Sequence, residues 1–379
     1  MSAWALALAG GWVAAYLGFA SSAVVAAGRA RRKPLPSAHA RRILVVRPCT
    51  GQPTFLAATL ASTSRLRHPG ELVVRFTVAD ARDPAWPLVR DAAARLREDG
   101  IDARALVAAT RAPNAKAGQL ARATADAAAF DIVAVIDADV ALEGPELVGL
   151  STCLNADVGA AWTPVQERQP PRTVGDRASS AILGRSLHAF DLLGRLDRGG
   201  LVGKCFAVRT DALLAVGGFA AVAHHLGEDM ELSRRLADAG FRTAVTARPA
   251  GSVAGDRSLR DVVARYRRWL LVMRAQRPWR LLAYPLLICA ALPLALIGVG
   301  LALGGVTAGL AVAALALLVR VAVVAATEGA TARRGLAAVV DAFVADAVLA
   351  WAWGSALGAR QTQWGGRQLR LGRDGRLLT

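Results

Sequence analysis

Long apolar stretches occupy both ends of this chain and constrain its fold more than any other feature. The first, residues 1–27, carries no charged side chain, and others follow within 281–325 and at 336–357. A helix of about 20 apolar residues is long enough to cross the hydrocarbon core of a bilayer. The sequence therefore predicts a multi-pass membrane protein in which residues 28–275 form a folded domain outside the bilayer.

Basic residues set the expected orientation of the first membrane segment. Six of them follow it: Arg29, Arg31, Arg32, Lys33, Arg41 and Arg42. Such residues are retained on the cytoplasmic side, so we expect the folded domain in the cytoplasm and the protein in the cell membrane. The alternative is a cleaved export signal, which would carry its charge before the apolar core and a cleavage site after it. The observed order favours an uncleaved anchor.

The C-terminal apolar stretches predict a hairpin and one further helix. Residues 281–325 contain two apolar stretches joined by an uncharged Gly-rich turn, with basic residues on both sides, so both ends of this hairpin belong in the cytoplasm. The stretch 336–357 contains Asp341 and Asp346, each of which costs about 2.5 to 3.5 kcal/mol at a bilayer centre. Crossing would also export the basic tail, residues 358–379. A re-entrant or interfacial helix is therefore favoured over a transmembrane one, with a cytosolic tail.

Composition limits the classes of function. The chain has 379 residues, a formal net charge of +17 and 54% hydrophobic residues. It is too apolar for an ordinary nucleic-acid binder, and its arginines cluster beside the membrane segments, so no nucleic-acid partner is expected. The four cysteines are widely spaced and form no Cys-x-x-Cys pair, which fits a reduced cytoplasmic domain.

The folded domain alternates short apolar runs with helical segments, a pattern typical of α/β architecture. Strands are expected at 43–46, 72–79, 105–108, 132–136, 203–209 and 242–247, and helices at 84–98, 115–130 and 229–239. The segment 166–177 is polar and Pro-rich, so it predicts a mobile loop near the functional site.

Three charged clusters follow one another along the chain. Asp137-Ala138-Asp139 comes directly after the strand 132–136, so both carboxylates emerge at its C-terminal end, where α/β sheets place their ligands. Two hard carboxylates there can hold Mg²⁺ or Mn²⁺, and such a cation neutralises the charge that develops on a sugar nucleotide's diphosphate. Glu228-Asp229 and Arg265-Tyr266-Arg267-Arg268-Trp269 come next. This order indicates a membrane-bound sugar transferase.

Each cluster also has an interpretation without function. An Asp-x-Asp after a strand is often only a turn or a helix cap. Glu228 and Asp229 open a helical stretch, where acidic residues favour the positive end of the helix dipole. Basic and aromatic residues are common just before a membrane segment. The conjunction of the three clusters, rather than any one of them, carries the functional prediction.

The motifs taken together resemble the ceramide glucosyltransferase family, whose bacterial relatives include the hopanoid-associated glycosyltransferases. The matching segments are Val78-Ala79-Asp80-Ala81-Arg82-Asp83-Pro84, Asn114-Ala115-Lys116, Asp137-Ala138-Asp139, Gly203-Lys204, Glu228-Asp229, Arg265-x-x-Arg268-Trp269 and Trp364-Gly365-Gly366-Arg367. The resemblance covers nearly the whole chain. It implies a cytosolic GT-A domain, which is a Rossmann-like α/β fold, a nucleotide-sugar donor and a lipid acceptor reached at the membrane face.

The resemblance implies donor-binding roles for five acidic or basic residues. Asp83, with Asp80 close to it, would lie near the uracil or ribose of a UDP-sugar. Lys116 would offer its positive charge to the donor diphosphate. Asp137 and Asp139 would serve the ribose and the metal-diphosphate region, with Mg²⁺ or Mn²⁺ as the metal.

The resemblance also implies the catalytic and acceptor-side residues. Asp229 would be the general base that takes a proton from the acceptor hydroxyl during inverting attack on the anomeric carbon. Arg265, Arg268 and Trp269 would close over the diphosphate and stabilise the departing charge. The residues expected on the acceptor side are Gly203, Lys204, Glu228, Trp364 and Arg367. One departure is Cys205-Phe206, where many relatives carry a small hydroxyl residue followed by methionine, so the acceptor-side pocket is expected to differ.

The function expected from these motifs is transfer of glucose or a related hexose to the hydroxyl of ceramide or of a ceramide-like or hopanoid lipid. A processive polysaccharide synthase is one alternative, but it normally needs more membrane spans than the three or so available here. A catalytically degenerate membrane scaffold is the other, and the intact Asp139, Asp229 and Arg268 argue against it.

Overall fold

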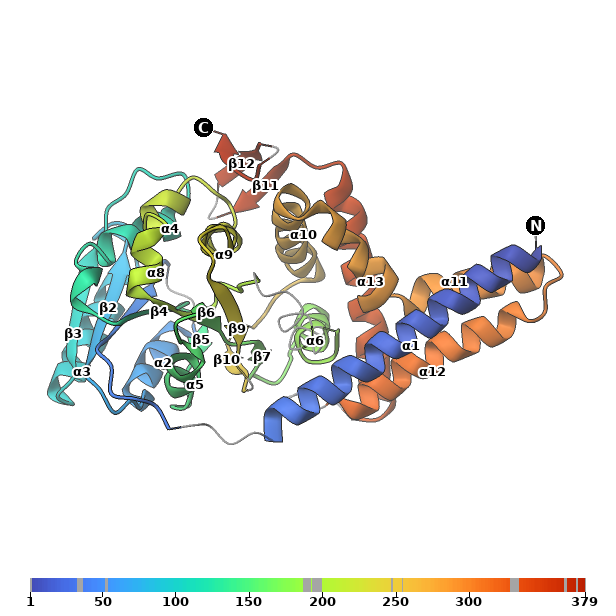
Figure 1. Cartoon of the computed structure of the whole chain (residues 1–379), viewed down its shortest axis with the longest axis horizontal. Helices are drawn as coiled ribbons and strands as arrows, with labels where there is room; N and C mark the ends of the chain where they lie inside the picture. Colours follow the sequence, from blue (N-terminus) through green and yellow to red (C-terminus); the bar gives the residue numbers. More distant parts are fainter. Residues whose placement is uncertain are drawn as a thin grey trace. The chain divides into compact units, whose positions relative to one another are not determined.

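The computed structural model describes most of the chain, in two units. The described residues are 2–32, 37–51, 54–186, 192, 200–246, 248–253, 255–327, 334–364, 367–372 and 374–378. The sheet unit consists of Ala30–Val165, Leu193–Ala254 and Leu369–Thr379, and the helical unit of Met1–Arg29, Gln166–Leu192 and Gly255–Gln368. Figure 1 colours these segments in chain order.

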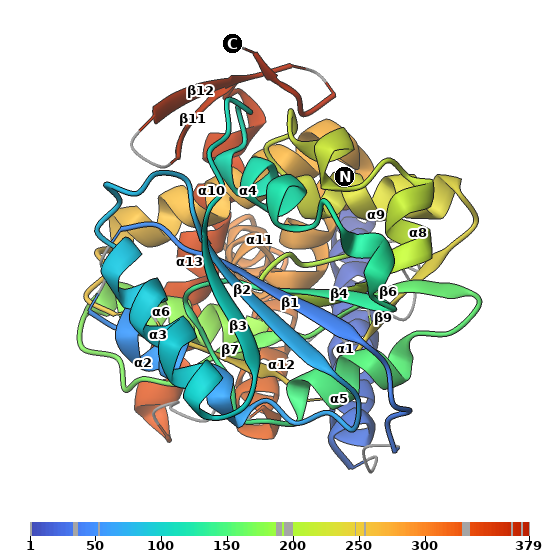
Figure 2. The same cartoon turned by 90° about the vertical axis from the view of Figure 1, so that its left-hand side faces the viewer.

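A seven-stranded sheet with the order β3-β2-β1-β4-β8-β6-β9 forms the centre of the sheet unit (Figure 2). Its strands are β1 (Ile43–Pro48), β2 (Leu72–Val78), β3 (Asp102–Val107), β4 (Ile132–Ile136), β6 (Val158–Trp162), β8 (Cys205–Arg209) and β9 (Arg242–Val245). The first four pair in parallel, and β8 runs antiparallel between β4 and β6. From β1 the chain continues outward to β2 and β3 and later returns to β4 on the other side. The switch point of the topology, where such sheets bind ligands, therefore lies between β1 and β4.

The central strands are apolar along their length because both of their faces are covered. Every residue of β1 and β4 is buried. Helix α3 (Trp86–Glu98) packs on β2 and β3 through Val89, Ala93 and Leu96, which share one helix face. It ends before Gly100, whose φ of +82° suits glycine. These residues explain why the sequence predicted β1, β4 and α3 correctly.

Shorter elements connect the strands of the sheet unit. They are α2 (Leu56–Ala61), the 3₁₀ turns Ser62–Arg65, Ala127–Ala129 and Phe219–Val222, α4 (Ala115–Ala123), β5 (Val140–Ala141), α5 (Glu146–Cys153), α8 (Thr210–Ala215), α9 (Glu228–Asp238), β10 (Ala250–Ser252), β12 (Arg367–Leu371) and β13 (Leu377–Leu378). The expected helix 115–130 is thus divided into α4 and a 3₁₀ turn. Strand β6 was not predicted, because the sequence Val-Gly-Ala-Ala-Trp has neither β-branched enrichment nor alternation.

The helical unit contains the apolar segments. Its elements are α1 (Ser2–Arg32), α6 (Val174–Ala181), the π-helical turns Ile182–Ser186 and Tyr284–Ile288, α10 (Leu259–Gln276), the 3₁₀ turn Pro278–Leu282, α11 (Ala291–Leu303), α12 (Gly309–Ala326), α13 (Leu336–Leu357) and β11 (Gln361–Trp364), and β7 (Val165–Glu167) begins at its boundary. Among the described residues, three helices are long and apolar enough to cross a membrane: Ala3–Arg29, Gly309–Ala326 and Leu336–Leu357. Pro278–Ile288 and Ala291–Leu303 form a fourth candidate, bent by 64°.

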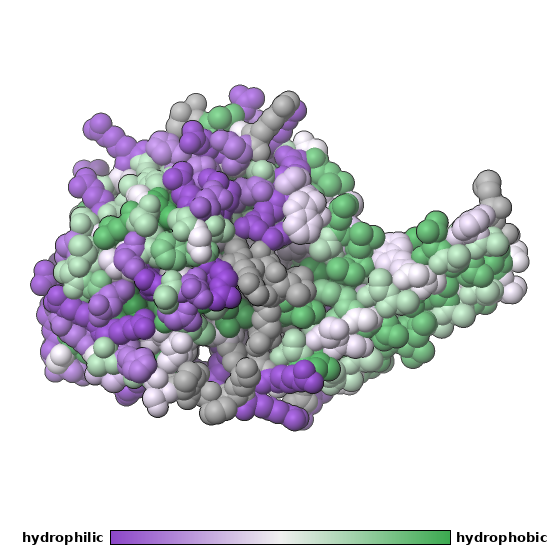
Figure 3. All heavy atoms as spheres, viewed as in Figure 1, coloured by the Kyte–Doolittle hydropathy of each residue, from purple (hydrophilic) through white to green (hydrophobic). Residues whose placement is uncertain are grey.

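The expected hairpin is formed by α11 and α12. The two helices approach most closely at Gly298 and Gly309: a Cβ on Gly298 would lie 2.5 Å from the Gly309 carbonyl oxygen. Small residues permit such close contact between helices in lipid. Figure 3 shows a mostly hydrophobic surface over α1 and α12, as a lipid environment requires.

Charged residues in α12 and α13 form a buried ion pair that the sequence analysis did not anticipate. The sequence analysis considered Asp341 and Asp346 but not Arg320, which lies in α12. Its guanidinium contacts Asp346 of α13 through two hydrogen bonds of 2.7 and 2.8 Å, and both side chains are at most 2% exposed. Asp341, the other acidic residue of α13, lies 3.9 Å from Arg177 of α6. Both carboxylates that made a crossing costly therefore have basic neighbours in the protein.

Helix α13 packs mainly against α10 and α6 rather than against α11 and α12. Figure 1 shows it running across the inner ends of α1, α11 and α12 rather than beside them along their length. The Arg320–Asp346 pair joins α13 to the hairpin, and the interfacial position of α13 stays a prediction.

The segment 166–177 is a loop only at residues 168–173, between the end of β7 and the start of α6. Its last residues form the first turn of α6, which begins with a capping box between Thr173 and Asp176. Glu167 is buried and accepts hydrogen bonds from Arg257 at 2.8 Å and from the Ser179 hydroxyl at 3.0 Å. The prolines indicated a loop, but buried partners elsewhere in the chain order these polar side chains.

Removing one partner of the Arg320–Asp346 pair should strongly destabilise the helical unit. Asp346→Leu removes the carboxylate that neutralises the buried Arg320 guanidinium, which costs about 3–5 kcal/mol for a buried pair. The double variant Arg320→Met/Asp346→Leu should regain most of that loss, since no charge remains unpaired. Chemical unfolding of the three proteins in detergent measures this, and equal stability of the single and double variants would contradict it.

Candidate active site

Strand β4 ends at Ile136, and the Asp137-Ala138-Asp139 segment follows at the switch point of the sheet. Because β8 is antiparallel to β4 and Cys205 pairs with Ile136, the residue before Cys205 also lies at this edge. The Asp137 amide donates to the Lys204 carbonyl oxygen at 2.8 Å. The topology therefore places the Gly203-Lys204 motif beside the two aspartates.

A buried arginine in β1 holds the main chain of the aspartate segment. Arg47 has no exposed surface, and its guanidinium donates to the carbonyl oxygens of Asp137 at 3.2 Å and Val140 at 2.6 Å. The same side chain is anchored by the Thr63 hydroxyl at 2.7 Å. Sequence analysis missed this residue. The available signal was a single arginine inside an otherwise apolar strand.

Two further donors complete the support of this segment. The Thr59 hydroxyl donates to the Ala138 carbonyl oxygen at 2.6 Å, and the Val253 amide donates to the Asp139 carbonyl oxygen at 2.7 Å. Together with Arg47, they bind every carbonyl from residue 137 to residue 140. The backbone that carries the two carboxylates is therefore fixed before any ligand is present.

The Lys116 ammonium contacts acidic residues from two separate parts of the chain, Asp137 and Glu228. It lies in the first turn of α4, which the Asn114 side chain caps. Its ammonium lies 2.7 Å from an Asp137 oxygen and 3.0 Å from a Glu228 oxygen, and donates to the Gly203 carbonyl oxygen at 2.9 Å. Burial alone would lower the pKa of Lys116, but the carboxylates of Asp137 and Glu228 raise it above its usual value. Lys116 is therefore charged at neutral pH.

Lys204 pairs with the second aspartate of the motif. Its ammonium donates to the Asp139 carboxylate and to the Ser252 hydroxyl, the latter at 3.2 Å. The Lys204 side chain is 12% exposed and that of Asp139 is 26% exposed, so water reaches the pair only partly. The sequence analysis placed Lys204 on the acceptor side and did not predict its pairing with Asp139.

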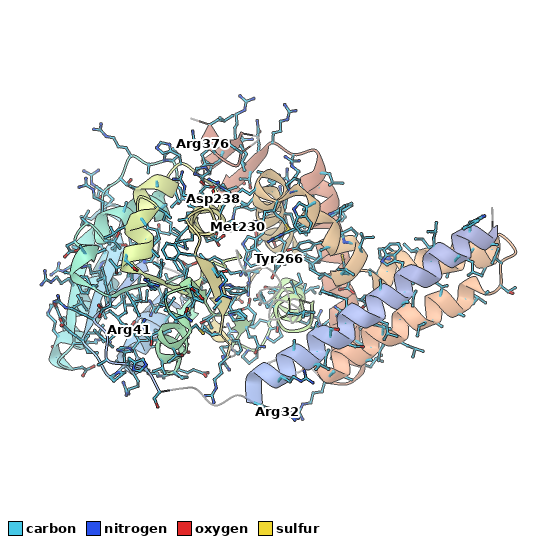
Figure 4. All side chains as sticks on the ribbon, viewed as in Figure 1. Arg32, Arg41, Met230, Asp238, Tyr266 and Arg376 are labelled. Carbon is cyan, nitrogen blue, oxygen red and sulfur yellow. The ribbon has the colours of Figure 1, made fainter. Side chains whose placement is uncertain are left out.

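Asp229 opens helix α9, whose course Met230 and Asp238 mark in Figure 4. Its carboxylate accepts hydrogen bonds from the Gly203 amide at 2.7 Å and from the Met230 amide at 2.8 Å. Burial raises the pKa of Asp229 to about 6, and the Glu228 carboxylate adds to the rise. A Cβ on Gly203 would lie 2.8 Å from an Asp229 oxygen, which explains the glycine at that position.

Asp83 and Asp80 follow β2 at the same edge of the sheet. Asp83 accepts hydrogen bonds from the Thr50 hydroxyl at 3.0 Å and the Gly51 amide at 2.8 Å, so it links the loop after β1 to the start of α3. Asp80 is exposed and accepts a hydrogen bond from the Arg82 amide at 2.8 Å. The structure thus brings the expected donor-binding residues to one edge.

The acidic residues at this edge suit a single divalent cation. Four carboxylates (Asp137, Asp139, Glu228 and Asp229) and two ammonium groups (Lys116 and Lys204) leave a formal excess of two negative charges when all are ionised. Asp137 and Asp139 offer the hard oxygen ligands that Mg²⁺ and Mn²⁺ prefer. The described residues contain no group of three or more His, Cys, Asp or Glu side chains able to hold a metal. A bound cation would therefore take its remaining ligands from substrate and water.

The basic and aromatic residues expected over the diphosphate lie in the helical unit, on α10. Arg265 and Trp269 are one turn apart, with the guanidinium 5.8 Å from the indole ring and 3.9 Å from the buried Glu167 carboxylate. Arg268 is partly buried. Tyr266, labelled in Figure 4, packs edge-to-face on Trp269 at 5.5 Å. Trp269 and Arg265 thus have fixed neighbours on their own helix.

The last two predicted site residues are described only by their main chain. Trp364 ends β11 and Arg367 begins β12. Their side chains lie outside the described residues, so their acceptor-side roles stay predictions.

The C-terminal residues support the loop that precedes Asp229. The Leu377 amide donates to the His224 carbonyl oxygen at 2.8 Å, and the Leu226 amide donates to the Gly375 carbonyl oxygen at 3.2 Å. His225 forms an antiparallel bridge with Arg376, and its carbonyl oxygen accepts a hydrogen bond from the Asn114 amide group at 2.9 Å. No local sequence signal indicated this contact.

Comparison with known protein families shows to which family this chain belongs. The sequence model of the family described as glycosyl transferase family 21 matches residues 10–377 of this chain. The chain belongs to this family. Family 21 is the ceramide glucosyltransferase family, so the family that the motifs indicated is confirmed, and the protein is a glycosyltransferase.

One solved structure confirms the fold of this family 21 member, and a second shares less of it. The mannosyltransferase PcManGT from Pyrobaculum calidifontis, in complex with GDP-Man and Mn²⁺, is 19% identical, with a TM-score of 0.51 over 93% of this chain and 99% of that chain. Glucosyl-3-phosphoglycerate synthase from Mycobacterium tuberculosis, in complex with Mn²⁺, UDP and phosphoglyceric acid, is 20% identical, with a TM-score of 0.37 over 59% and 74% of the two chains. No curated protein sequence matches this chain. The expected GT-A fold is confirmed.

Loss of the Arg47 guanidinium should displace the aspartate segment. Arg47→Met removes the guanidinium donor of the Val140 carbonyl and leaves the Asp137 carbonyl with the Val140 amide alone, and each buried group left unsatisfied costs about 1–3 kcal/mol. We expect weaker binding of a nucleotide sugar in a calorimetric titration. Arg75→Met is the control, because Arg75 is also a buried arginine of the sheet, 8% exposed in β2, but contacts Asp126. Equal nucleotide-sugar affinity of the two variants would contradict a positioning role for Arg47.

Proposed function

We propose that this protein is an inverting glycosyltransferase that moves a hexose, glucose or a close relative, from a UDP-sugar to the hydroxyl of a membrane lipid. Ceramide, a ceramide-like lipid or a hopanoid lipid is the proposed acceptor class. The observation that carries the proposal is the convergence of Asp137, Asp139 and Asp229 with two lysines at the switch point of a GT-A sheet.

Donor binding is assigned to the residues at the C-terminal edge of β1, β2 and β4. Asp83, with Asp80 beside it, accepts hydrogen bonds from the uracil or ribose. Lys116 faces the diphosphate. Asp137 and Asp139 hold Mg²⁺ or Mn²⁺, which supplies positive charge to the departing diphosphate. The Mn²⁺ and GDP-Man bound to the similar mannosyltransferase support a metal-assisted nucleotide-sugar reaction.

Asp229 is the proposed general base. Two main-chain amides orient its carboxylate, and each oxygen keeps lone-pair capacity for the acceptor's proton. In the reaction, the acceptor oxygen bonds to the anomeric carbon as the bond from that carbon to the diphosphate oxygen breaks. The proton moves to Asp229, and the bonding electrons leave with the diphosphate. Arg265, Arg268 and Trp269 of α10 are proposed to stabilise the charge on that leaving group.

The apolar helices support a lipid acceptor. We propose that α1 anchors the protein, that α11 and α12 form a transmembrane hairpin, and that α13 lies at the interface. The basic residues behind α1 favour a cytoplasmic sheet unit. An acceptor embedded in the same membrane then needs no soluble carrier. Gly203, Lys204, Glu228, Trp364 and Arg367 are the proposed acceptor-side residues.

The decisive experiment incubates purified full-length protein in lipid with a panel of labelled nucleotide sugars and lipid acceptors. We expect a single hexose on a lipid, with activity that chelation abolishes and that Mg²⁺ or Mn²⁺ restores. A polymeric product would favour a processive synthase. Absence of transfer to any lipid, with intact hydrolysis of a nucleotide sugar, would reject the acceptor class.

Activity should depend on deprotonation of Asp229. Because its pKa is raised to about 6, the carboxylate that accepts a proton predominates only above that pH. The value of kcat/KM should therefore rise from pH 5 to pH 7, with an inflection near 6. Asp229→Asn should lower turnover by roughly 10²–10⁴-fold. Asp238→Asn, exposed at the other end of α9, is the control and should keep normal turnover.

A further inference from the structure

The ammonium of Lys204 and a divalent cation compete for one carboxylate. We propose that Lys204 is an exchangeable counter-ion: it neutralises Asp139 in the metal-free protein, the divalent cation displaces it, and the released ammonium binds the phosphate of the nucleotide. This inference rests on the proposed function, in which Asp139 is a metal ligand. It concerns a separate property, the affinity for metal in the absence of a donor.

The contact geometry makes the competition direct. The Lys204 ammonium donates to Asp139 through the carboxylate that the metal would use. A hard cation binds a carboxylate oxygen at about 2.0–2.2 Å, closer than any ammonium hydrogen bond. Two cations on one half-buried carboxylate repel each other strongly, because little water screens them. Metal binding therefore requires the ammonium to withdraw.

The structure allows the side chain to leave without moving the backbone. The Lys204 carbonyl oxygen accepts a hydrogen bond from the Asp137 amide, and the next residue, Cys205, begins β8. The main chain is therefore held by the sheet. The ammonium stands on a flexible four-carbon stem, so rotation of side-chain bonds is enough to move it several ångströms. The exchange is a local side-chain movement.

Lys116 is not suited to the same exchange. Its ammonium bridges Asp137, Glu228 and the Gly203 carbonyl oxygen, so binding of a metal by Asp137 still leaves it with two acceptors. Lys116 thus has a fixed position that holds three loops together. Lys204 instead pairs with Asp139, a proposed metal ligand, and with the neutral Ser252 hydroxyl, so loss of the Asp139 contact leaves it without the second carboxylate that Glu228 gives Lys116.

The net charge of the site after metal binding favours contact between the released Lys204 ammonium and the donor phosphates. A divalent cation cancels the formal excess of two negative charges among the four carboxylates and two lysines. A nucleoside diphosphate sugar then brings two more negative charges to the same edge. The released ammonium, still covalently anchored beside Asp139, is a charge-assisted donor for those phosphate oxygens. Metal binding therefore prepares the site for the donor.

Lys204→Met gives two effects of opposite sign. In full-length protein in detergent, an Mn²⁺ titration followed by electron paramagnetic resonance should show about tenfold tighter binding of Mn²⁺ alone, because the competitor is gone. UDP titrated into the Mn²⁺-saturated variant should bind about tenfold more weakly, because the phosphate contact is lost. Lys204→Arg keeps the charge and should keep both affinities near those of the natural protein. Thermal unfolding checks that each variant is folded.

Ser252→Ala is a milder variant that keeps the lysine. It removes the hydroxyl that also holds the ammonium, so Mn²⁺ alone should bind a few-fold more tightly while UDP binding stays unchanged. Unchanged Mn²⁺ affinity in both Lys204→Met and Ser252→Ala would overturn the exchange and leave the proposed metal-dependent reaction intact. A natural protein that binds no Mn²⁺ with or without UDP would overturn the metal role itself.

Discussion

The crowding of carboxylates at the switch point is the constraint on which the rest of the site depends. Asp137, Asp139 and Asp229 come from two loops, and their mutual repulsion would separate those loops without compensation. Lys116 supplies that compensation by bridging Asp137 and Glu228 while it binds the Gly203 carbonyl oxygen. The lysine is itself placed by the Asn114 cap of α4. One ammonium therefore joins the loops after β4, before β8 and before α9.

The support of this cluster continues into the core. The buried Arg47 guanidinium donates to main-chain carbonyl oxygens of the aspartate segment, which offsets part of the cost of burying its charge. Because Arg47 lies near the C-terminal end of β1, the sheet itself fixes the aspartate segment. Asn114 extends the support in the other direction, through Glu228 and the His225 carbonyl oxygen. Buried polar side chains, Arg47 and Asn114, thus hold the partly exposed acidic residues of the site in place.

The sequence was sufficient where the signal was local. The apolar runs at β1, β2 and β4 and the helical spacing of α3 follow from periodicity alone, and the Asp137-Ala138-Asp139 segment was placed correctly at the end of β4. Periodicity could not identify the partners of residues that contact distant parts of the chain. Arg47, the partners of Glu167 and the pairing of Arg320 with Asp346 depend on tertiary contacts. An isolated charge in an apolar run shows that a partner exists without identifying it.

The contacts of the C-terminal residues also limit how the chain crosses the membrane. Gly375 and Leu377 are hydrogen-bonded to Leu226 and His224, so the tail and the loop before Asp229 lie on the same side of the membrane. If the apolar helices cross a bilayer, the chain therefore crosses it an even number of times between residues 255 and 368. The candidates among the described residues of that interval are α12, α13 and the bent pair that includes α11. We propose that α11 and α12, which pack together, are the crossing pair and that α13, which packs on α10 and α6, does not cross.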